Sequence, residues 1–293
     1  MARISIGTYA SQPALVDSVN THWIETPSGI IVIDTQRIVP EAMRAIGHIR
    51  AVGKPVLAIF VTHPHTDHYG GLPLFREAFP SATVYASADT IRSMREDSKG
   101  YNAARRQRHG EIFVTQQQIA DSLPNAVLRD GQELDIGGVM LSIAELRGSE
   151  AEVTTLLHIP EANALFVGDL VNDGYVPVPF ESTSAWLRQL DTISAGYSGM
   201  TTVYMGHGRP GPLRERVAAQ RAYLSDLLTS VRARIGDGSL SKADAEQVSV
   251  EIERLWPFWH GVGGQPRQEV IRFVAGLIAK QEGATVEGQA QFR

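Results

Sequence analysis

A dense group of potential metal ligands lies between residues 63 and 68. The run His63-Pro64-His65-Thr66-Asp67-His68 holds three histidines and one aspartate within six residues. In an extended segment alternate side chains point to the same side, so the imidazoles of His63 and His65 can bind one metal ion. Asp67 and His68 follow where the chain turns, and they can face a second ion close by. The run therefore predicts metal-dependent chemistry.

The surroundings of this run favour the metal interpretation. It follows Val56-Leu57-Ala58-Ile59-Phe60-Val61, which predicts a buried strand. So many polar groups beside an apolar core would cost folding free energy unless they were compensated. The chain has no cysteine, so a metal site must use His, Asp and Glu. Gly70-Gly71 then removes side-chain bulk where a tight turn needs it.

Short β-branched runs alternate with helical periodicities along the part of the chain that would position this group. Strands are predicted over 30–33, 56–61, 83–86, 138–146, 153–159, 163–168 and 201–205. Helices are predicted over 40–52, 72–79 and 182–195. Mixed β and βα units of this kind predict an α/β protein, with two sheets packed face to face and helices outside.

After Gly206–Pro212 the sequence changes to helical periodicity. Four apolar residues share one helical face: Leu224, Leu227, Leu228 and Val231. Helical patterns continue over 241–255 and 267–280. We therefore expect a C-terminal helical extension, residues 213–293, packed on a main domain of residues 1–212. Three aromatic residues are expected to pack this extension onto the core: Trp256, Phe258 and Trp259.

Composition and charge narrow the classes of function. Hydrophobic residues make up 43% and charged residues 20%, which is typical of a globular chain with a sizeable core. The formal net charge of -5 disfavours a nucleic-acid partner, since the one basic stretch, Arg105–His109, is short. That stretch fits a solvated helix face or a local anion contact. Neither a signal-peptide core nor a membrane-spanning run is visible, so we expect a soluble, cytoplasmic protein without membrane binding.

The segment Thr62–Gly71 resembles the signature of the metallo-β-lactamase superfamily. Three further segments resemble other motifs of that family, in the same order, over residues 15–212: Ile31-Val32-Ile33-Asp34, Phe166-Val167-Gly168-Asp169-Leu170 and Tyr204-Met205-Gly206-His207-Gly208. The resemblance implies an αββα sandwich with a metal site along one edge. It also implies that Asp34 orients a ligand from behind, that Asp169 bridges two metals and that His207 is a ligand.

The chain departs from the family pattern at one ligand. Where the family has a third motif histidine, counting back from Pro160 leads to Glu150. Three interpretations stay open: Glu150 replaces the imidazole, Glu152 replaces it, or the site lacks one ligand and binds a single metal. Sulfatases of the superfamily resemble this chain in using glutamates near this point.

The resemblance implies two divalent ions with the ligands divided between them. His63, His65 and Glu150 would hold one ion, Asp67, His68 and His207 would hold the other, and Asp169 would bridge them. Zinc is the expected metal, and the additional oxygen ligand makes manganese or iron an alternative. With Glu150 as a ligand, three carboxylates and a bridging hydroxide balance the four positive charges of two divalent ions, so the cluster is neutral. With histidine in place of Glu150, the cluster would carry one positive charge.

The activity implied is that of a metal-dependent hydrolase in which a metal-bound hydroxide attacks a small ester-type substrate, with lactones or other carboxylic esters considered first. Sulfatase, thioesterase and phosphoesterase activities are alternatives, as is a degenerate binding protein without turnover. The catalytic candidates are Asp67, Asp169 and Tyr175. Tyr69 is a further possible helper, and a packing role is the alternative for both tyrosines.

The expected partner is a small-molecule substrate, and the sequence is compatible with a homodimer. The polar segment from Lys99 to Gln118 predicts a lid, a pocket wall or an exposed connector.

Overall fold

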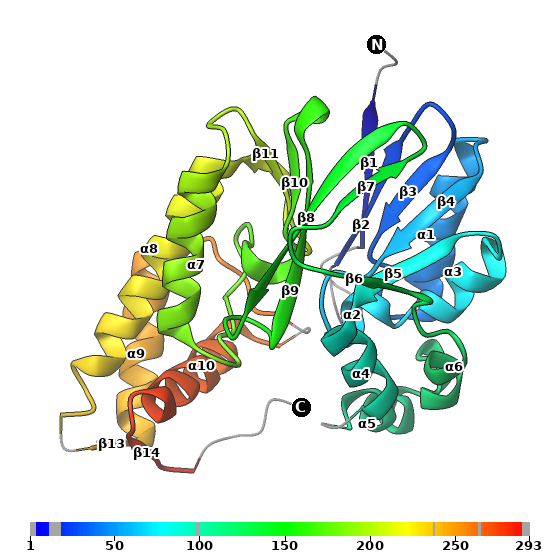
Figure 1. The fold of residues 1–293 in the computed structure, drawn as a ribbon. Coiled ribbons are helices and arrows are strands. Elements are labelled where there is room, and N and C mark those ends of the chain that lie inside the picture. Colours follow the sequence, from blue (N-terminus) through cyan, green and yellow to red (C-terminus); the bar gives the residue numbers. More distant parts are fainter. Residues whose placement is uncertain (1–3, 12–18, 98–99, 237, 263–264, 289–293) are drawn as a thin grey trace.

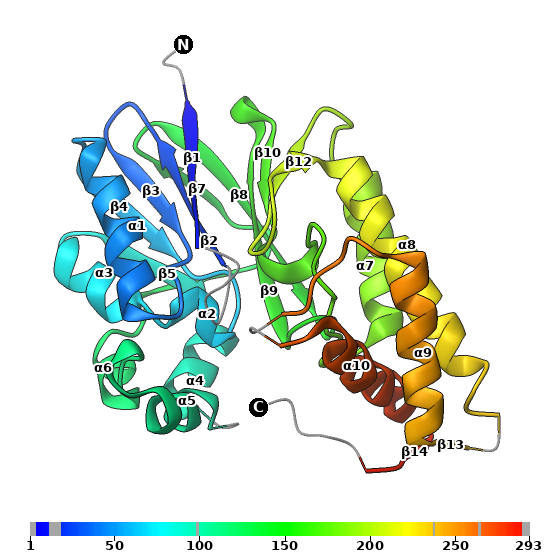
Figure 2. The same cartoon turned by 180° about the vertical axis from the view of Figure 1, so that it is seen from behind.

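Two six-stranded sheets lie face to face, and helices cover the outer face of each (Figures 1 and 2). The structure, a computed structural model, describes residues 4–11, 19–97, 100–236, 238–262 and 265–288. The predicted αββα sandwich with a C-terminal helical region is confirmed.

The first sheet has the order β1-β2-β3-β4-β5-β6. Its strands are β1 (Ser5–Ala10), β2 (Asn20–Glu25), β3 (Ile30–Ile33), β4 (Val56–Phe60), β5 (Thr83–Ser87) and β6 (Ala126–Leu128). The first three strands pair antiparallel, and β3 to β6 pair parallel. Parallel neighbours need crossover connections, which explains the helices between β3 and β6.

The second sheet has the order β12-β11-β10-β9-β8-β7. Its strands are β7 (Glu133–Ile136), β8 (Val139–Arg147), β9 (Val153–Ile159), β10 (Ala164–Phe166), β11 (Thr202–Tyr204) and β12 (Gly211–Pro212). Strand β10 ends two residues before the predicted 168, because Gly168 takes φ 52° and starts the 3-10 helix η3 (Gly168–Leu170). That turn carries Asp169.

Alternation along β3 shows how the layers pack. Ile31 and Ile33 lie in the cluster between the two sheets, with Phe60 and Phe166. Ile30 and Val32 lie in the cluster on the opposite face, under the helices. Successive side chains of a strand point to opposite faces, so a strand covered on both sides must be apolar throughout.

Helices of the first half of the chain lie over the outer face of the first sheet or at its lower end in Figure 1. They are α1 (Val39–Ala51), α2 (Thr66–Tyr69), α3 (Leu72–Ala78), α4 (Ala88–Glu96), α5 (Tyr101–His109), η1 (Gly110–Ile112) and α6 (Gln116–Asp121). The second sheet is covered by α7 (Thr183–Gly196) and α8 (Leu213–Arg232), whose Trp186 and Val217 pack against Leu165 and Val203. The short helix η2 (Pro160–Ala162) joins β9 to β10.

A second helical core lies beyond this sandwich. It is built from α8, α9 (Lys242–Leu255) and α10 (Arg267–Gln281), with the short strands β13 (Ser239–Leu240) and β14 (Thr285–Val286) at one end. Helix α8 begins at the residue where the extension was predicted to begin. Because α8 packs against the second sheet as well as against α9 and α10, the division into two domains stays a prediction.

The aromatic residues after α9 behave differently from one another. Trp259 is buried and Trp256 packs against the helical core, but Phe258 is 85% exposed, so its predicted packing role was wrong. The backbone N–H of Trp259 donates to the carbonyl of Trp256, which makes this segment a tight turn. Phe258 lies at its outer corner, where a side chain faces solvent.

The same segment returns to the main sandwich. The N–H of His260 donates to the carbonyl of Gly174 at 2.7 Å, and the N–H of Val176 donates to the carbonyl of His260 at 2.9 Å. These two bonds attach the helical extension to the backbone on either side of Tyr175.

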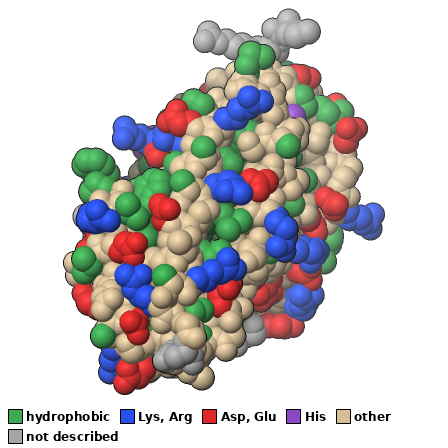
Figure 3. Space-filling view, turned by 90° about the vertical axis from the view of Figure 1, so that its left-hand side faces the viewer, with side chains coloured by type: hydrophobic (Ala, Val, Ile, Leu, Met, Phe, Trp, Pro, Cys, Tyr) green, Lys and Arg blue, Asp and Glu red, His purple; other side chains and the backbone are tan. Residues whose placement is uncertain are grey.

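The surface seen from the side of α8 and α9 mixes hydrophobic side chains with charged ones of both signs (Figure 3). Among the described residues, no helix has both the length and the apolar character needed to cross a membrane.

His22 on β2 links the two sheets through a buried imidazole. Its Nε2 lies 3.0 Å from the carbonyl of Met205, and its Nδ1 lies 2.8 Å from Thr8 Oγ1. A carbonyl only accepts, so Nε2 carries the proton and the Thr8 hydroxyl donates to Nδ1. Burial lowers the pKa of His22 from 6.5 to about 4, although the Met205 bond and Asp34 act in the opposite direction.

We predict that His22→Gln weakens the acid sensitivity of folding. Below pH 6.5 the unfolded chain protonates His22 whereas the folded state does not. Stability present at neutral pH is therefore lost as pH falls, by roughly 2 kcal/mol at about pH 5. Glutamine keeps a donor and an acceptor but cannot titrate. Urea unfolding of both proteins at about pH 7.5 and pH 5 measures this, and an equal loss of stability in both would contradict it.

Candidate metal centre

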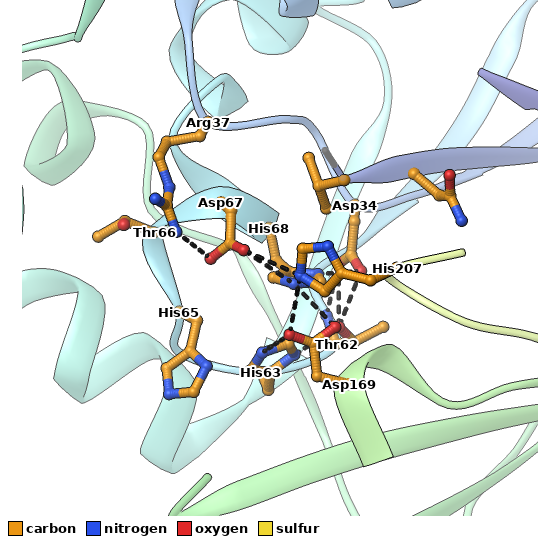
Figure 4. A network of polar contacts seen from close by, with 12 residues as sticks. Asp34, Arg37, Thr62, His63, His65, Thr66, Asp67, His68, Asp169 and His207 are labelled. Carbon is orange, nitrogen blue, oxygen red and sulfur yellow. Dashed lines mark hydrogen bonds and ion pairs between the residues drawn. The ribbon is translucent and has the colours of Figure 1, made fainter. Parts of the chain in front are cut away.

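Seven predicted ligands come together at one edge of the sandwich: His63, His65, Asp67, His68, Glu150, Asp169 and His207. All of them except Glu150 are labelled in Figure 4. The histidine run follows β4 and enters α2, Glu150 lies between β8 and β9, Asp169 follows β10, and His207 follows β11. The carboxyl ends of β4, β10 and β11 thus deliver their following residues to the same place.

The ligand atoms form two groups that share Asp169. One group is His63, His65, Glu150 and Asp169, and the other is Asp67, His68, Asp169 and His207. Within each group the ligand atoms lie within 4.8 Å of one another. This is the division that the sequence predicted for two ions.

Individual distances fit the spacing of atoms around a metal. The atoms His65 Nδ1 and Glu150 Oε1 are 3.0 Å apart, and His63 Nε2 and Asp169 Oδ2 are 3.8 Å apart. His207 Nε2 lies 3.2 Å from Asp169 Oδ2. Ligand atoms bound tetrahedrally at about 2.1 Å from an ion lie about 3.4 Å from one another.

Several of these atoms lack hydrogen-bond partners. The buried atoms His63 Nε2, His68 Nε2, Glu150 Oε2 and Asp169 Oδ1 have none among the described residues. A buried polar atom without a partner costs about 1–3 kcal/mol, so four in one place are a costly arrangement unless something binds them. Imidazole nitrogens and carboxylate oxygens are ligands suited to a divalent metal, and these residues therefore fit one.

Asp34 fixes the orientation of two imidazoles from behind. Its Oδ2 accepts from His68 Nδ1 at 2.7 Å and from Thr62 Oγ1 at 2.8 Å. Since the Thr62 hydroxyl donates to Asp34, it accepts from His63 Nδ1, which lies 3.0 Å away. Both histidines consequently turn their Nε2 toward the group. Asp34 is buried and takes φ 60°, a strained backbone conformation for an aspartate.

Burial and the neighbouring charges shift the pKa values of the histidines and carboxylates in the two ligand groups. Burial lowers the pKa of His63 well below its usual value. Burial also acts against the protonated forms of His68 and His207, but Asp169 and neighbouring carboxylates outweigh it: they raise the pKa of His68 well above 6.5 and that of His207 to about 10. For Asp169 the burial penalty is outweighed by His207 and His68, which hold its pKa well below 3.8. His207 and His68 thus favour the ionised form of Asp169, whereas burial raises the pKa of Glu150.

Glu150 and Glu152 lie in different environments. Glu150 is 4% exposed and its carboxylate faces His65 and His63. Glu152 is exposed, lies outside both groups, and accepts from Ser93 Oγ at 3.3 Å. The geometry therefore favours Glu150 as the replacement for the family histidine.

The two tyrosines singled out by sequence lie beside the group and outside it. The Tyr175 ring centre lies 5.7 Å from that of His207. Tyr69 is 2% exposed and packs in the core between the first sheet and its helices, in agreement with a packing role.

Two arginines that sequence reasoning did not connect with the site contact the histidine run. Arg37 Nη2 lies 2.8 Å from Asp67 Oδ1, and Arg105 Nη1 donates to Thr66 Oγ1 at 2.7 Å. Arg105 belongs to α5, within the segment 99–118, of which Lys99 lies outside the described residues. The basic stretch around Arg105 was noticed in the sequence, but Arg37 belongs to no sequence motif from which its contact with Asp67 could be predicted.

A pocket opens beside His65. Its described lining residues are Pro64, His65, Thr66, Tyr69, Ser93, Asp97, Tyr101, Glu152 and Glu181. Tyr101 begins α5, so this helix forms part of the pocket wall. The ring centre of Phe180 lies 5.3 Å from that of His65, in an edge-to-face arrangement.

Glycines let the backbone approach the group closely. A Cβ added to Gly206 would lie 2.1 Å from Asp169 Oδ1 and 2.5 Å from His68 Cε1. At Gly168, which has a positive φ, a Cβ would lie 2.9 Å from His63 Nδ1. The Gly-Asp and Gly-His motifs therefore need glycine for space as well as for conformation.

The chain belongs to the metallo-β-lactamase superfamily, whose family model ("Metallo-beta-lactamase superfamily") matches residues 14–207. Members of this superfamily are metallo-hydrolases that bind divalent metals, usually zinc.

Among its relatives, the linear primary-alkylsulfatase of a Pseudomonas species is 23% identical over 225 residues, which are 66% of this chain and 42% of that protein. The acyl-coenzyme A thioesterase MBLAC2 of Gallus gallus is 32% identical over 150 residues, 47% of this chain and 51% of that protein. The chain thus matches about half or less of the length of each.

A solved structure of a metallo-beta-lactamase family protein from Thermus thermophilus aligns with a TM-score of 0.66 at 20% identity. The alignment covers 95% of this chain and 94% of that one, so the likeness of fold includes the C-terminal helices.

We predict that Gly206→Ala lowers the metal content of the purified protein to less than half of the wild-type value. The added methyl group would displace Asp169, which belongs to both ligand groups. Gly196→Ala is the matched control, since a Cβ there meets nothing within 4 Å. Elemental analysis together with circular dichroism measures the outcome, and a folded Gly206→Ala protein with full metal content would contradict the prediction.

A second prediction separates the two glutamates. Glu150→Gln should remove about one metal ion per chain, because it takes a charged oxygen from the group around His65. Glu152→Gln should retain the wild-type metal content, since its carboxylate lies outside both groups. The reverse pattern in elemental analysis would show that Glu152 is the ligand.

Proposed function

We propose that the chain is a metal-dependent hydrolase of small ester-type substrates, with lactones or other carboxylic esters as the first class. The observation that carries this proposal is the pair of four-residue groups that share Asp169. Such a pair suits two ions held side by side, with zinc as the expected metal and manganese or iron as alternatives.

The residues divide the work of holding two ions. His63, His65 and Glu150 would hold one, Asp67, His68 and His207 would hold the other, and Asp169 would contribute to both groups. When bound, the ions supply Lewis acidity toward a carbonyl oxygen and allow water to attack at neutral pH. Asp34 and Thr62 keep the imidazoles of His63 and His68 turned inward, so the ligand set is ordered before substrate arrives.

Tyr175 is proposed to contact the substrate beside His207. Its ring lies next to that imidazole, and the backbone on either side of it is held by His260. A phenol in this position can donate a hydrogen bond to a carbonyl or leaving-group oxygen.

The pocket beside His65 favours a neutral substrate. Three carboxylates, those of Asp97, Glu152 and Glu181, lie among its described lining residues. A cleft bordered by one sign of charge repels ligands of the same sign. Uncharged esters therefore suit this approach better than phosphate esters, and the relative that acts on acyl-coenzyme A shows an acyl substrate in this superfamily.

Alkyl sulfate hydrolysis is the second candidate. Glu150 supports it, because sulfatases of the superfamily resemble this chain in using glutamates near this position, and an alkylsulfatase is among the relatives. The acidic pocket border is the observation that places it second.

We predict that the metal-loaded protein hydrolyses uncharged esters and that Asp169→Ala lowers kcat/KM at least about a thousandfold. A panel of lactones, nitrophenyl esters, alkyl sulfates, phosphate esters and thioesters, run on protein of measured metal content, tests both statements. Treatment with a chelator should abolish turnover, and metal should restore it.

Asp191→Ala is the matched control, since Asp191 lies on the surface and pairs with Arg221. This variant should keep wild-type activity. A protein that binds no metal and hydrolyses nothing would favour a degenerate binding protein, and full activity of a folded Asp169→Ala protein would exclude the proposed centre.

A further inference from the structure

Arg37 lies in a connection whose backbone is unusually constrained. It follows β3 and precedes α1. Asp34 and Gln36, which come shortly before it in the same connection, take φ 60° and φ 70°. The Gln36 amide donates to the carbonyl of Val19 and to Thr21 Oγ1, both at 3.0 Å. Non-glycine residues hold such conformations only where the surroundings fix them, and they cluster at functional sites.

The guanidinium of Arg37 is directed into the ligand group. Its Nη2 lies 2.8 Å from Asp67 Oδ1, and the two side chains are 8% and 7% exposed (Figure 4). The other oxygen, Asp67 Oδ2, lies 3.2 Å from His207 Nε2 and 3.7 Å from His68 Nε2. Arg37 thus occupies one oxygen of Asp67 and leaves the other facing its ligand group.

The charge of Arg37 matters because of Glu150. Three ligand carboxylates, those of Asp67, Glu150 and Asp169, leave two divalent ions with a single net positive charge. A histidine at position 150 would leave two. A buried guanidinium stays charged and adds one positive charge, so the total with Glu150 and Arg37 equals that of a site with histidine alone.

We propose that Arg37 is a positioning residue that also compensates the charge of Glu150. By binding one oxygen of Asp67, Arg37 orients the other oxygen toward the ligand group. Its positive charge also replaces the unit of net positive charge that the site loses when glutamate stands in place of the third motif histidine. Negative charge that develops on the carbonyl oxygen of an ester then meets that field. The inference rests on the proposed metal centre and goes beyond it, since it concerns a residue that contacts a ligand and binds no ion.

The test is a double-mutant cycle of Arg37→Gln and Glu150→His, read by the binding of inorganic phosphate to metal-loaded protein in calorimetry. One unit of buried charge near the anion should change its affinity about tenfold. We expect Arg37→Gln to weaken phosphate binding about tenfold, Glu150→His to strengthen it about tenfold, and the double variant to return within about twofold of wild type.

Two further variants separate charge from position. Arg37→Lys keeps the charge and should bind phosphate as wild type does. Arg221→Gln is the matched control and should change nothing, because Arg221 is exposed on α8 and pairs with the exposed Asp191. Metal content is measured for every protein.

Phosphate binding by Arg37→Gln at the wild-type level, or a double variant that does not return toward wild type, would overturn the proposal. So would metal loss in Arg37→Gln together with weak phosphate binding by a metal-loaded Arg37→Lys. Because no turnover is measured, a wild-type protein that binds metal and phosphate but hydrolyses no ester would refute the proposed function and leave this inference standing.

Discussion

The structure depends on the burial of several carboxylates in one small space. Asp34, Asp67, Glu150 and Asp169 are each less than 9% exposed, and they lie among four imidazoles at a sheet edge. Buried carboxylates without partners would cost far more than a fold of this size can lose, so each must face a cation or a donor. The neighbouring elements supply both: Arg37 faces Asp67, and Thr62 and His68 face Asp34.

The sandwich fold meets this requirement by bringing strand ends together. The first sheet delivers the histidine run after β4, and the second delivers Asp169 and His207 after β10 and β11. Two glycines beside these ligands let the backbones of the two sheets approach until the side chains touch. The apolar layers of the sandwich bring the strand ends together at the edge where the ligands lie. The polar contacts at that edge then fix the orientation of the individual ligand side chains. Neither alone would define the site.

Much of this could be predicted, because the informative patterns are local. A strand that is covered on both faces, such as Ile30–Ile33, is a continuous apolar run, and this run can be recognised in the sequence. The ligand motifs follow directly after such strands. Contacts that depend on the path of the chain could not be predicted. Arg37 meets Asp67 only because the loop after β3 turns back, and Phe258 is exposed because it occupies a turn between two inward-facing tryptophans. Helix α5 was predicted only in part, as a solvated helix face at Arg105–His109, because its polar sequence carries little apolar periodicity.

The attachment of His260 to both sides of Tyr175 has a consequence for the order of events during synthesis. A ribosome releases the chain from its N-terminus, so every residue of the two ligand groups has emerged once His207 has. The backbone that holds Tyr175 arrives more than fifty residues later. The chain therefore holds all of its predicted ligands before the segment that fixes Tyr175 has been made, so the ligand set and the positioning of Tyr175 are encoded by separate parts of the sequence.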